Sequence, residues 1–129
     1  MMGLFDGYDR DRGSSAEIAS MLDVPVVLMV DARSAAYSVA ALLSGFLHFR
    51  KDVHIAGIIF NKVGSERHRQ MLRQVCSDLQ VECFGFLPKH PELEQSSRYL
   101  GLDFSEESSS KELVKLLEEN VRWEKLLEL

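Results

Sequence analysis

The amino-acid sequence predicts an α/β domain that is built on a parallel sheet. Three short apolar segments rich in β-branched residues alternate with segments whose apolar residues recur at helical spacing. The short segments are apolar on both faces, which is typical of strands buried inside a parallel sheet. Strands that alternate with helices join through right-handed crossovers, so the order of the elements also favours this class of fold.

The first helix and the first strand have clear boundaries. Ser14 and Glu17 form a capping-box pattern, which predicts a short helix that continues to about Leu22. Pro25 prevents that helix from continuing. The run VPVVLMVDA comes next and predicts a central strand that ends at Asp31.

The remaining elements follow the same alternation. The sequence predicts a helix, a strand, a helix and a strand over 33–49, 53–63, 65–79 and 81–89. A short helix is expected from Pro91 to Tyr99, followed by a turn at Gly101. A capping box that begins at Ser109 predicts a last helix that runs without a break to the end of the chain.

Length and composition limit the possible functions. The chain has 129 residues, which suits one domain over 1–129. Its net charge of −5 argues against a nucleic-acid-binding surface, because such a surface needs clustered cations. No apolar run is long enough to span a bilayer and no signal peptide is recognisable, so we expect a cytoplasmic location and no membrane partner. Cys76 and Cys83 fit no metal or disulfide spacing and are expected to be reduced thiols packed as small apolar residues.

Polar loops follow the predicted strands. Ligands of open parallel sheets bind beyond the carboxyl ends of the strands. The loops at 31–34, 61–68 and 87–93 stand at such ends, and the opening segment GLFDG at 3–7 would join them if a strand preceded it. We therefore expect these loops to form a ligand-binding site on one face of the domain.

Each candidate residue of these loops has two interpretations. Asn61 carries an acceptor and donors that suit the edge of adenine, or it caps the following helix. Asp6 lies between two glycines, where the backbone can approach a phosphate or Mg²⁺ closely, or it merely forms a turn. Asp31 and Arg33 hold a metal ion and an anionic substrate, or they pair with each other. The histidines are scattered and are expected to be surface or rim residues: His48, His54, His68 and His90.

Several segments together resemble cobyrinic acid a,c-diamide synthase. MGLFDG and NKVGSERH carry the resemblance most specifically, and VVLMVDAR, AALLSGF and LPKHPELEQSSRYLGL extend it in the same order to about Leu102. More distantly, the chain is similar to dethiobiotin synthetase and to the ParA- and MinD-like ATPases. The resemblance implies a three-layer, Rossmann-like fold and a P-loop NTPase domain of which this chain holds an incomplete part.

The resemblance also implies an activity, its cofactors and its residues. Members of that family are ligases of cobalamin biosynthesis: ATP and Mg²⁺ activate the a- and c-acetate carboxylates of the corrinoid as acyl phosphates, and ammonia from glutamine displaces the phosphate. Asp6 matches the family's aspartate beside the phosphates and is implied to be a catalytic residue and a metal ligand. The residues implied to contact ATP are Asn61, Lys62, Leu87 and Pro88, and those implied to contact the substrate are Asp31 and Arg33.

The chain departs from that family in several ways. Tyr99 stands where the family usually has histidine, and no G-x-x-x-x-G-K-[ST] phosphate loop is present. The family's glutamine amidotransferase domain is also missing. The resemblance therefore implies the middle piece of a larger enzyme, inactive by itself. Without its neighbouring strand, the segment 26–30 is expected to form an open edge and to pair with a second copy in a homodimer.

Two other hypotheses stay open at the level of sequence. The parent could be a related diamide synthase, such as the sirohydrochlorin enzyme of a nickel-cofactor pathway, or a regulatory domain similar to dethiobiotin synthetase. The chain could instead be a non-catalytic interaction module. The sequence also leaves open whether cobyrinate or hydrogenobyrinate is the parent's substrate.

Overall fold

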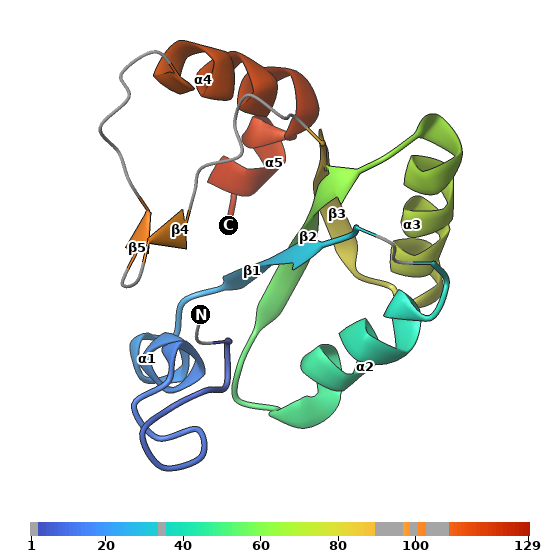
Figure 1. Cartoon of the computed structure of the whole chain (residues 1–129). Helices are drawn as coiled ribbons and strands as arrows, with labels where there is room; N and C mark the ends of the chain where they lie inside the picture. The colour runs from blue at the N-terminus through green and yellow to red at the C-terminus, as the bar shows by residue number, and fades with distance from the viewer. Residues whose placement is uncertain (1–2, 34–35, 90–96, 99–100, 103–108) are drawn as a thin grey trace.

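A computed structural model describes residues 3–33, 36–89, 97–98, 101–102 and 109–129. Three parallel strands form its sheet in the order β1-β2-β3: β1 (Val26–Asp31), β2 (Ile55–Val63) and β3 (Glu82–Pro88) (Figure 1). The helices are α1 (Ser15–Leu22), α2 (Val39–Phe49), α3 (Glu66–Asp78), α4 (Ser109–Asn120) and α5 (Trp123–Leu127). The parallel α/β class predicted from the alternating pattern is confirmed.

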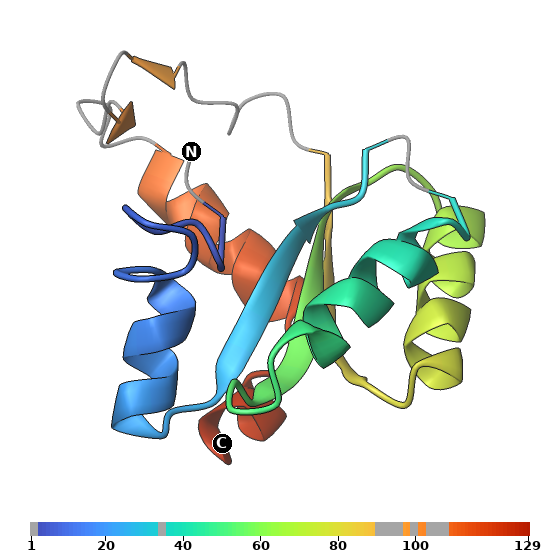
Figure 2. The ribbon, with the colours of Figure 1, turned by 90° about the horizontal axis from the view of Figure 1, so that it is seen from below.

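The sheet and its helices form three layers. In Figure 2, α2 and α3 lie on one side of the sheet and α4 lies on the other. Leu43 of α2 and Leu72 of α3 pack with Ile58 and Phe60 of β2 in the first core. The second core is smaller, and there Val121 joins side chains of β2 and β3. The expectation of a three-layer, Rossmann-like arrangement is confirmed.

The central strand β2 is buried because both of its faces and both of its edges are covered. Ile58 and Phe60 are fully buried on one face and Ile59 is buried on the other. The ring of Phe60 stacks on that of Phe86 in β3, with 5.7 Å between the ring centroids. Burying a side chain of this size stabilises a fold by roughly 1.5–3 kcal/mol, so each of these residues of β2 contributes substantially to the stability of the sheet.

Gly57 of β2 makes room for a neighbouring aromatic ring. A Cβ atom at this position would lie 2.3 Å from Cε2 of Phe84 and 2.7 Å from the carbonyl oxygen of Glu82. Neither the buried ring nor the backbone can move away easily. Glycine is therefore required here by the close approach of β3.

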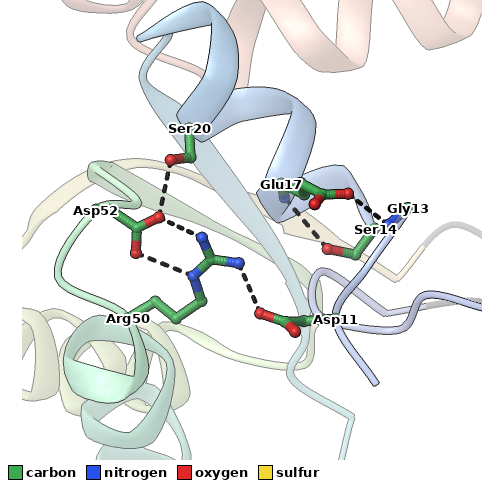
Figure 3. A network of polar contacts seen from close by, with 7 residues as sticks. All are labelled: Asp11, Gly13, Ser14, Glu17, Ser20, Arg50 and Asp52. Carbon is green, nitrogen blue, oxygen red and sulfur yellow. Dashed lines mark hydrogen bonds and ion pairs between the residues drawn. The ribbon is translucent and has the colours of Figure 1, made fainter. Parts of the chain in front are cut away.

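The N-terminal segment is attached to the end of α2 by a polar network (Figure 3). The guanidinium of Arg50 donates to the carboxylate of Asp11 at 2.6 Å and also binds that of Asp52, which accepts a hydrogen bond from the Ser20 hydroxyl at 2.8 Å. The hydrogen bonds from Arg50 and Ser20 lower the pKa of Asp52. The ring of Phe5 adds an apolar contact with the ring of Phe49, and the two ring centroids lie 4.9 Å apart.

The predicted capping box of the first helix is confirmed with one difference. The Ser14 hydroxyl accepts from the Glu17 N–H at 3.2 Å, as expected. The Glu17 carboxylate accepts from the N–H of Gly13 at 2.5 Å, one residue before the N-cap (Figure 3). The reciprocal bond therefore holds the loop that enters the helix rather than the cap residue itself.

The strand β1 is an open edge, as the sequence predicts. It pairs with β2 alone among the described residues. The N–H of Val26 donates to the carbonyl oxygen of His54, and that of Ala32 donates to the carbonyl oxygen of Asn61. Because successive residues of a strand direct their backbone groups to opposite sides, the odd-numbered residues between these two direct theirs away from β2. Met29 is 60% exposed on this edge, and no charged side chain interrupts the strand before Asp31.

The prediction of one unbroken C-terminal helix is wrong. The helix stops at Asn120, and Val121 forms an antiparallel bridge with Gly85 of β3. The N–H of Arg122 donates to the carbonyl of Phe84 at 2.7 Å before α5 begins. The carbonyl of Phe84 on the edge of β3 takes the Arg122 N–H, whereas the N–H of Val121 still donates to the carbonyl of Leu117 at 2.9 Å, as in a helix. A local helical pattern carries no sign of that competition for Arg122.

The expected helix over 91–99 is contradicted at the two residues where it can be assessed. Ser97 and Arg98 form β4 (Ser97–Arg98), which pairs in antiparallel fashion with β5 (Gly101–Leu102). Gly101 therefore lies in a strand rather than in a turn. The rest of that prediction, 91–96 and Tyr99, lies outside the described residues.

The role of Gly57 can be tested against a second glycine. We expect Gly57→Ala to destabilise the chain by roughly 1–3 kcal/mol, because the added methyl overpacks the contact with Phe84. Gly45 lies exposed in α2 with nothing within 4 Å of a Cβ atom, so Gly45→Ala should stabilise by roughly 0.5–1 kcal/mol. Urea unfolding measures both. Equal effects of the same sign would contradict the packing argument.

We propose that the open edge of β1 pairs with β1 of a second copy. A two-fold axis through the edge would set the strands antiparallel and bring the two Met29 side chains close together. Met29→Lys should then dissociate the dimer, because it places like charges opposite each other. Light scattering after size-exclusion chromatography measures the mass. Leu127→Lys changes an equally apolar, exposed residue of α5 and should leave the dimer intact; a wild-type monomer at high concentration would refute the proposal.

Candidate functional site

The parallel strands bring Asp31 and Asn61 side by side. The two residues are register partners at the carboxyl ends of β1 and β2. The Asp31 carboxylate accepts from the Arg33 N–H at 2.9 Å, from the Arg33 guanidinium at 3.3 Å and from Lys62 Nζ at 3.1 Å. The pKa of Asp31 is lowered, first by the Arg33 N–H, while burial opposes the shift and Lys62 adds to it. Of the two interpretations of Asp31 and Arg33, the structure contains the ion pair.

Lys62 has a backbone conformation that is rare for a residue with a side chain. Its φ is 60°, in the left-handed region, although it stands within β2. The pairing with β3 is irregular at the same place, because the register shifts between Phe60 and Val63. Such strain costs about 1–2 kcal/mol and is found preferentially at functional sites. The strained residue directs its ammonium to Asp31 and so joins the ends of β1 and β2.

Asn61 does not cap the following helix. Ser65 is the N-cap of α3, and its hydroxyl accepts from the His68 N–H at 3.1 Å. The side-chain oxygen of Asn61 accepts from the Lys62 N–H at 2.9 Å, and its amide N–H groups have no partner among the residues that the structure describes. The capping alternative is therefore wrong, and the amide donors are available to a ligand.

His68 is a residue of the site that the sequence treats only as a rim histidine. Its Nδ1 accepts from the Gly64 N–H at 3.2 Å, which holds the loop between β2 and α3 and leaves the proton on Nε2. Nε2 is buried and has no hydrogen-bond partner among the described residues. A buried donor without a partner is unusual. The only signal in the sequence is that His68 ends the NKVGSERH segment.

Leu87 and Pro88 lie at the carboxyl end of β3, beside the end of β2. Pro88 is the register partner of Val63. The Leu87 side chain is buried in the second core with Ile59 and Phe84. At Leu87 the backbone, and not the side chain, can therefore face a ligand at the strand ends, while Pro88 is only partly buried.

Asp6 lies in the N-terminal loop. Its carboxylate accepts from the Gly3 N–H at 2.6 Å and forms no hydrogen bond to the strand ends among the residues that the structure describes. The neighbouring Gly7 is required for another reason, since a Cβ atom there would lie 2.0 Å from the Arg12 carbonyl oxygen. Within the described ranges, no three His, Cys, Asp or Glu side chains gather to hold a metal ion. At Gly7 it is therefore the backbone of Arg12, in the same loop, that makes the close approach.

The chemistry of these groups fits a nucleotide with Mg²⁺ only in part. The amide of Asn61 and the backbone near Leu87 can meet a base. The single carboxylate of Asp6 fits Mg²⁺ that takes its other ligands from phosphates and water. Lys62 is engaged with Asp31, so it is not a free cation for phosphate in this structure.

The sequence of the chain matches a protein-family model. The model described as an AAA domain matches residues 6–97, which include Asp6, Asp31, Asn61 and Leu87. This match covers more than half of the chain, and the chain belongs to that family. No solved structure is significantly similar to it.

Curated relatives narrow the class further. The cobyrinate a,c-diamide synthase of Caldanaerobacter subterraneus subsp. tengcongensis is 51% identical, over 100% of this chain and 30% of the relative. The hydrogenobyrinate a,c-diamide synthase of Brucella ovis is 50% identical, over 87% of this chain and 26% of the relative. The enzyme of the same name from Mycobacterium bovis is 48% identical, over 79% of this chain and 24% of the relative. The resemblance inferred from MGLFDG and NKVGSERH is confirmed, and the chain spans less than a third of the length of these relatives.

The strain at Lys62 can be measured by substitution. Lys62→Gly and Lys62→Ala both remove the ion pair with Asp31, but only glycine accepts a φ of 60° without strain. We expect the glycine variant to be more stable than the alanine variant by roughly 0.5–1 kcal/mol. Thermal or urea unfolding measures the difference. An alanine variant at least as stable as the glycine variant would show that the residue is not strained.

Proposed function

We propose that this chain is the part of an ATP-dependent ligase that holds the base of the nucleotide and one side of a corrinoid substrate. The parent enzyme converts the a- and c-acetate carboxylates of cobyrinic acid, or of hydrogenobyrinic acid, into amides. The names of the relatives support this substrate class, since they include enzymes of both kinds. The observation that carries the proposal is the pair of register partners Asp31 and Asn61 at the carboxyl ends of β1 and β2, where ligands of open parallel sheets bind.

The proposed reaction has two steps for each carboxylate. A carboxylate oxygen first attacks the γ-phosphorus of ATP, which forms an acyl phosphate and releases ADP. Ammonia from glutamine then attacks the acyl carbon, which forms the amide and releases phosphate and a proton. Both steps develop negative charge on phosphate oxygens, which Mg²⁺ and fixed donors stabilise.

Each residue has a proposed role in this scheme. The side-chain amide of Asn61 and the backbone at Leu87 and Pro88 bind the adenine. Arg33 and Asp31 lie on the substrate side, and Asp6 is the proposed ligand of Mg²⁺. Lys62 fixes the end of β2 against Asp31, 3.1 Å away, and adds positive charge near the nucleotide.

The chain by itself is expected to bind nucleotide weakly and to be inactive. It contains no G-x-x-x-x-G-K-[ST] segment, whose amides and lysine would hold the phosphates. The base and the substrate side supply only part of the binding free energy. Among the described residues, no helix is long and apolar enough to cross a membrane.

Nuclear magnetic resonance of the 129-residue chain tests the proposal. Titration with adenosine should shift the signals of Asn61 and Leu87 with a dissociation constant on the order of 1 mM. Asn61→Ala should remove these shifts, because it removes both donors to the base. Gln70→Ala changes an exposed amide of α3 and should leave them unchanged.

A second titration uses cobyrinic acid in place of adenosine. We expect shifts at Asp31 and Arg33, reduced by Arg33→Gln. Shifts by adenosine alone would support the nucleotide role and contradict the corrinoid assignment. Micromolar binding of Mg-ATP would contradict the expectation that this chain lacks the groups that hold the phosphates.

A further inference from the structure

A cavity of about 460 Å³ lies at the opposite edge of the sheet from β1. It is a cleft open to solvent, lined by α3, by β3 and by the junction between α4 and α5. None of the residues assigned above to nucleotide, metal or corrinoid lines it. Small-molecule sites commonly have volumes of about 300–1,000 Å³, so the cavity can hold a ligand of metabolite size.

Three arginines line this cavity, and each is held in place. The guanidinium groups of Arg69 and Arg73 lie 5.7 and 5.4 Å from the ring centroid of Phe86. Arg122 binds the Glu82 carboxylate and the Cys83 carbonyl oxygen. Because these contacts restrict the side chains before any ligand binds, less conformational entropy is lost on binding.

The charge around the cavity is positive, although the chain as a whole carries −5. The nearby carboxylates are already paired: Glu66 with Arg69 at 3.7 Å, Glu82 with Arg122 and with Lys125 at 3.5 Å, and Glu119 with Lys115 at 3.9 Å. Arg73 has no ion pair among the described residues, and its guanidinium lies over the ring of Phe86. Of the charged residues that line the cavity, three are arginines and two are glutamates, so the lining carries one excess positive charge that an anion would balance.

Besides Glu82 and Glu119, the wall of the cavity includes two thiols. Cys76 and Cys83 are buried free thiols, as the sequence predicts. A hydrogen bond with Cys83, together with burial, raises the pKa of Cys76, and the same hydrogen bond lowers the pKa of Cys83. The cavity thus combines fixed guanidinium groups with two paired carboxylates and two small thiols.

We propose that this cavity binds a small ligand that carries at least two oxyanion groups, either phosphates or carboxylates. Guanidinium groups recognise both through paired N–H···O bonds. Arg73 makes the central contact because its charge has no ion pair within the described ranges, and Arg69 and Arg122 contact a second oxyanion. The site is independent of the nucleotide site proposed above.

Calorimetry on the whole chain at constant ionic strength tests this inference. The probes are inorganic pyrophosphate and citrate, in separate titrations. We expect saturable binding of at least one probe with a dissociation constant below about 1 mM. Arg73→Gln should weaken binding about tenfold or more, and Arg73→Lys should weaken it less.

The matched control is Arg67→Gln, which removes an exposed arginine of the same helix that does not line the cavity. It changes the net charge equally and should alter binding less than about twofold. Binding of pyrophosphate alone would identify a phosphate ligand, and binding of citrate alone a carboxylate ligand. Binding of neither probe, or equal weakening by Arg67→Gln and Arg73→Gln, would overturn the proposal.

A further variant separates this cavity from the strand ends. Asn61→Ala should leave the binding of both probes unchanged. If Asn61→Ala abolished binding while Arg73→Gln had no effect, the anion would lie at the proposed nucleotide site and the cavity proposal would be wrong. Thermal unfolding monitored by circular dichroism confirms that each variant is folded before it is compared.

Discussion

The parallel pairing of β2 with a strand on each side is the interaction on which the rest of the structure depends. Ile58, Ile59 and Phe60 can be buried only because helices cover both faces of the sheet and strands cover both edges of β2. The same parallel pairing brings the carboxyl ends of the three strands to one end of the sheet. Asp31 and Asn61 are far apart in the sequence, and the strand register is what brings them side by side.

The candidate site uses this register and departs from it at one residue. In a regular strand the side chains would continue to alternate between the two faces at Lys62. Here the backbone of Lys62 is left-handed, and the register of the pairing with β3 shifts. The cost is offset by the buried strand on one side and the helix cap at Ser65 on the other. The ammonium of Lys62 thus reaches Asp31, whose place beside Asn61 is already set by the strand register.

The two edges of the sheet differ in a way that matters for binding. The edge of β1 is open and apolar, which suits another strand. The edge of β3 is partly covered by Val121 and Arg122, whose backbone bonds interrupt the C-terminal helix. The same interruption brings Arg122 beside Arg69 and Arg73 at the arginine-lined cavity. The contact of Val121 and Arg122 with β3 thus both interrupts the C-terminal helix and forms one wall of the proposed anion site.

The sequence by itself determined the class of fold, the three buried strands and the loops that follow them, because these depend on periodicity and on residues close together in the chain. The MGLFDG and NKVGSERH segments also determined the family. Only the structure decided that Asn61 leaves the helix cap to Ser65, that His68 holds the loop, that the Asp6 carboxylate accepts from Gly3, and that the Arg122 N–H donates to β3. The first three outcomes are choices between partners within a few residues, which a sequence pattern leaves open because several donors and acceptors lie within reach of one another. The last depends on the edge of β3, which becomes a partner of the C-terminal segment only once the strands have met.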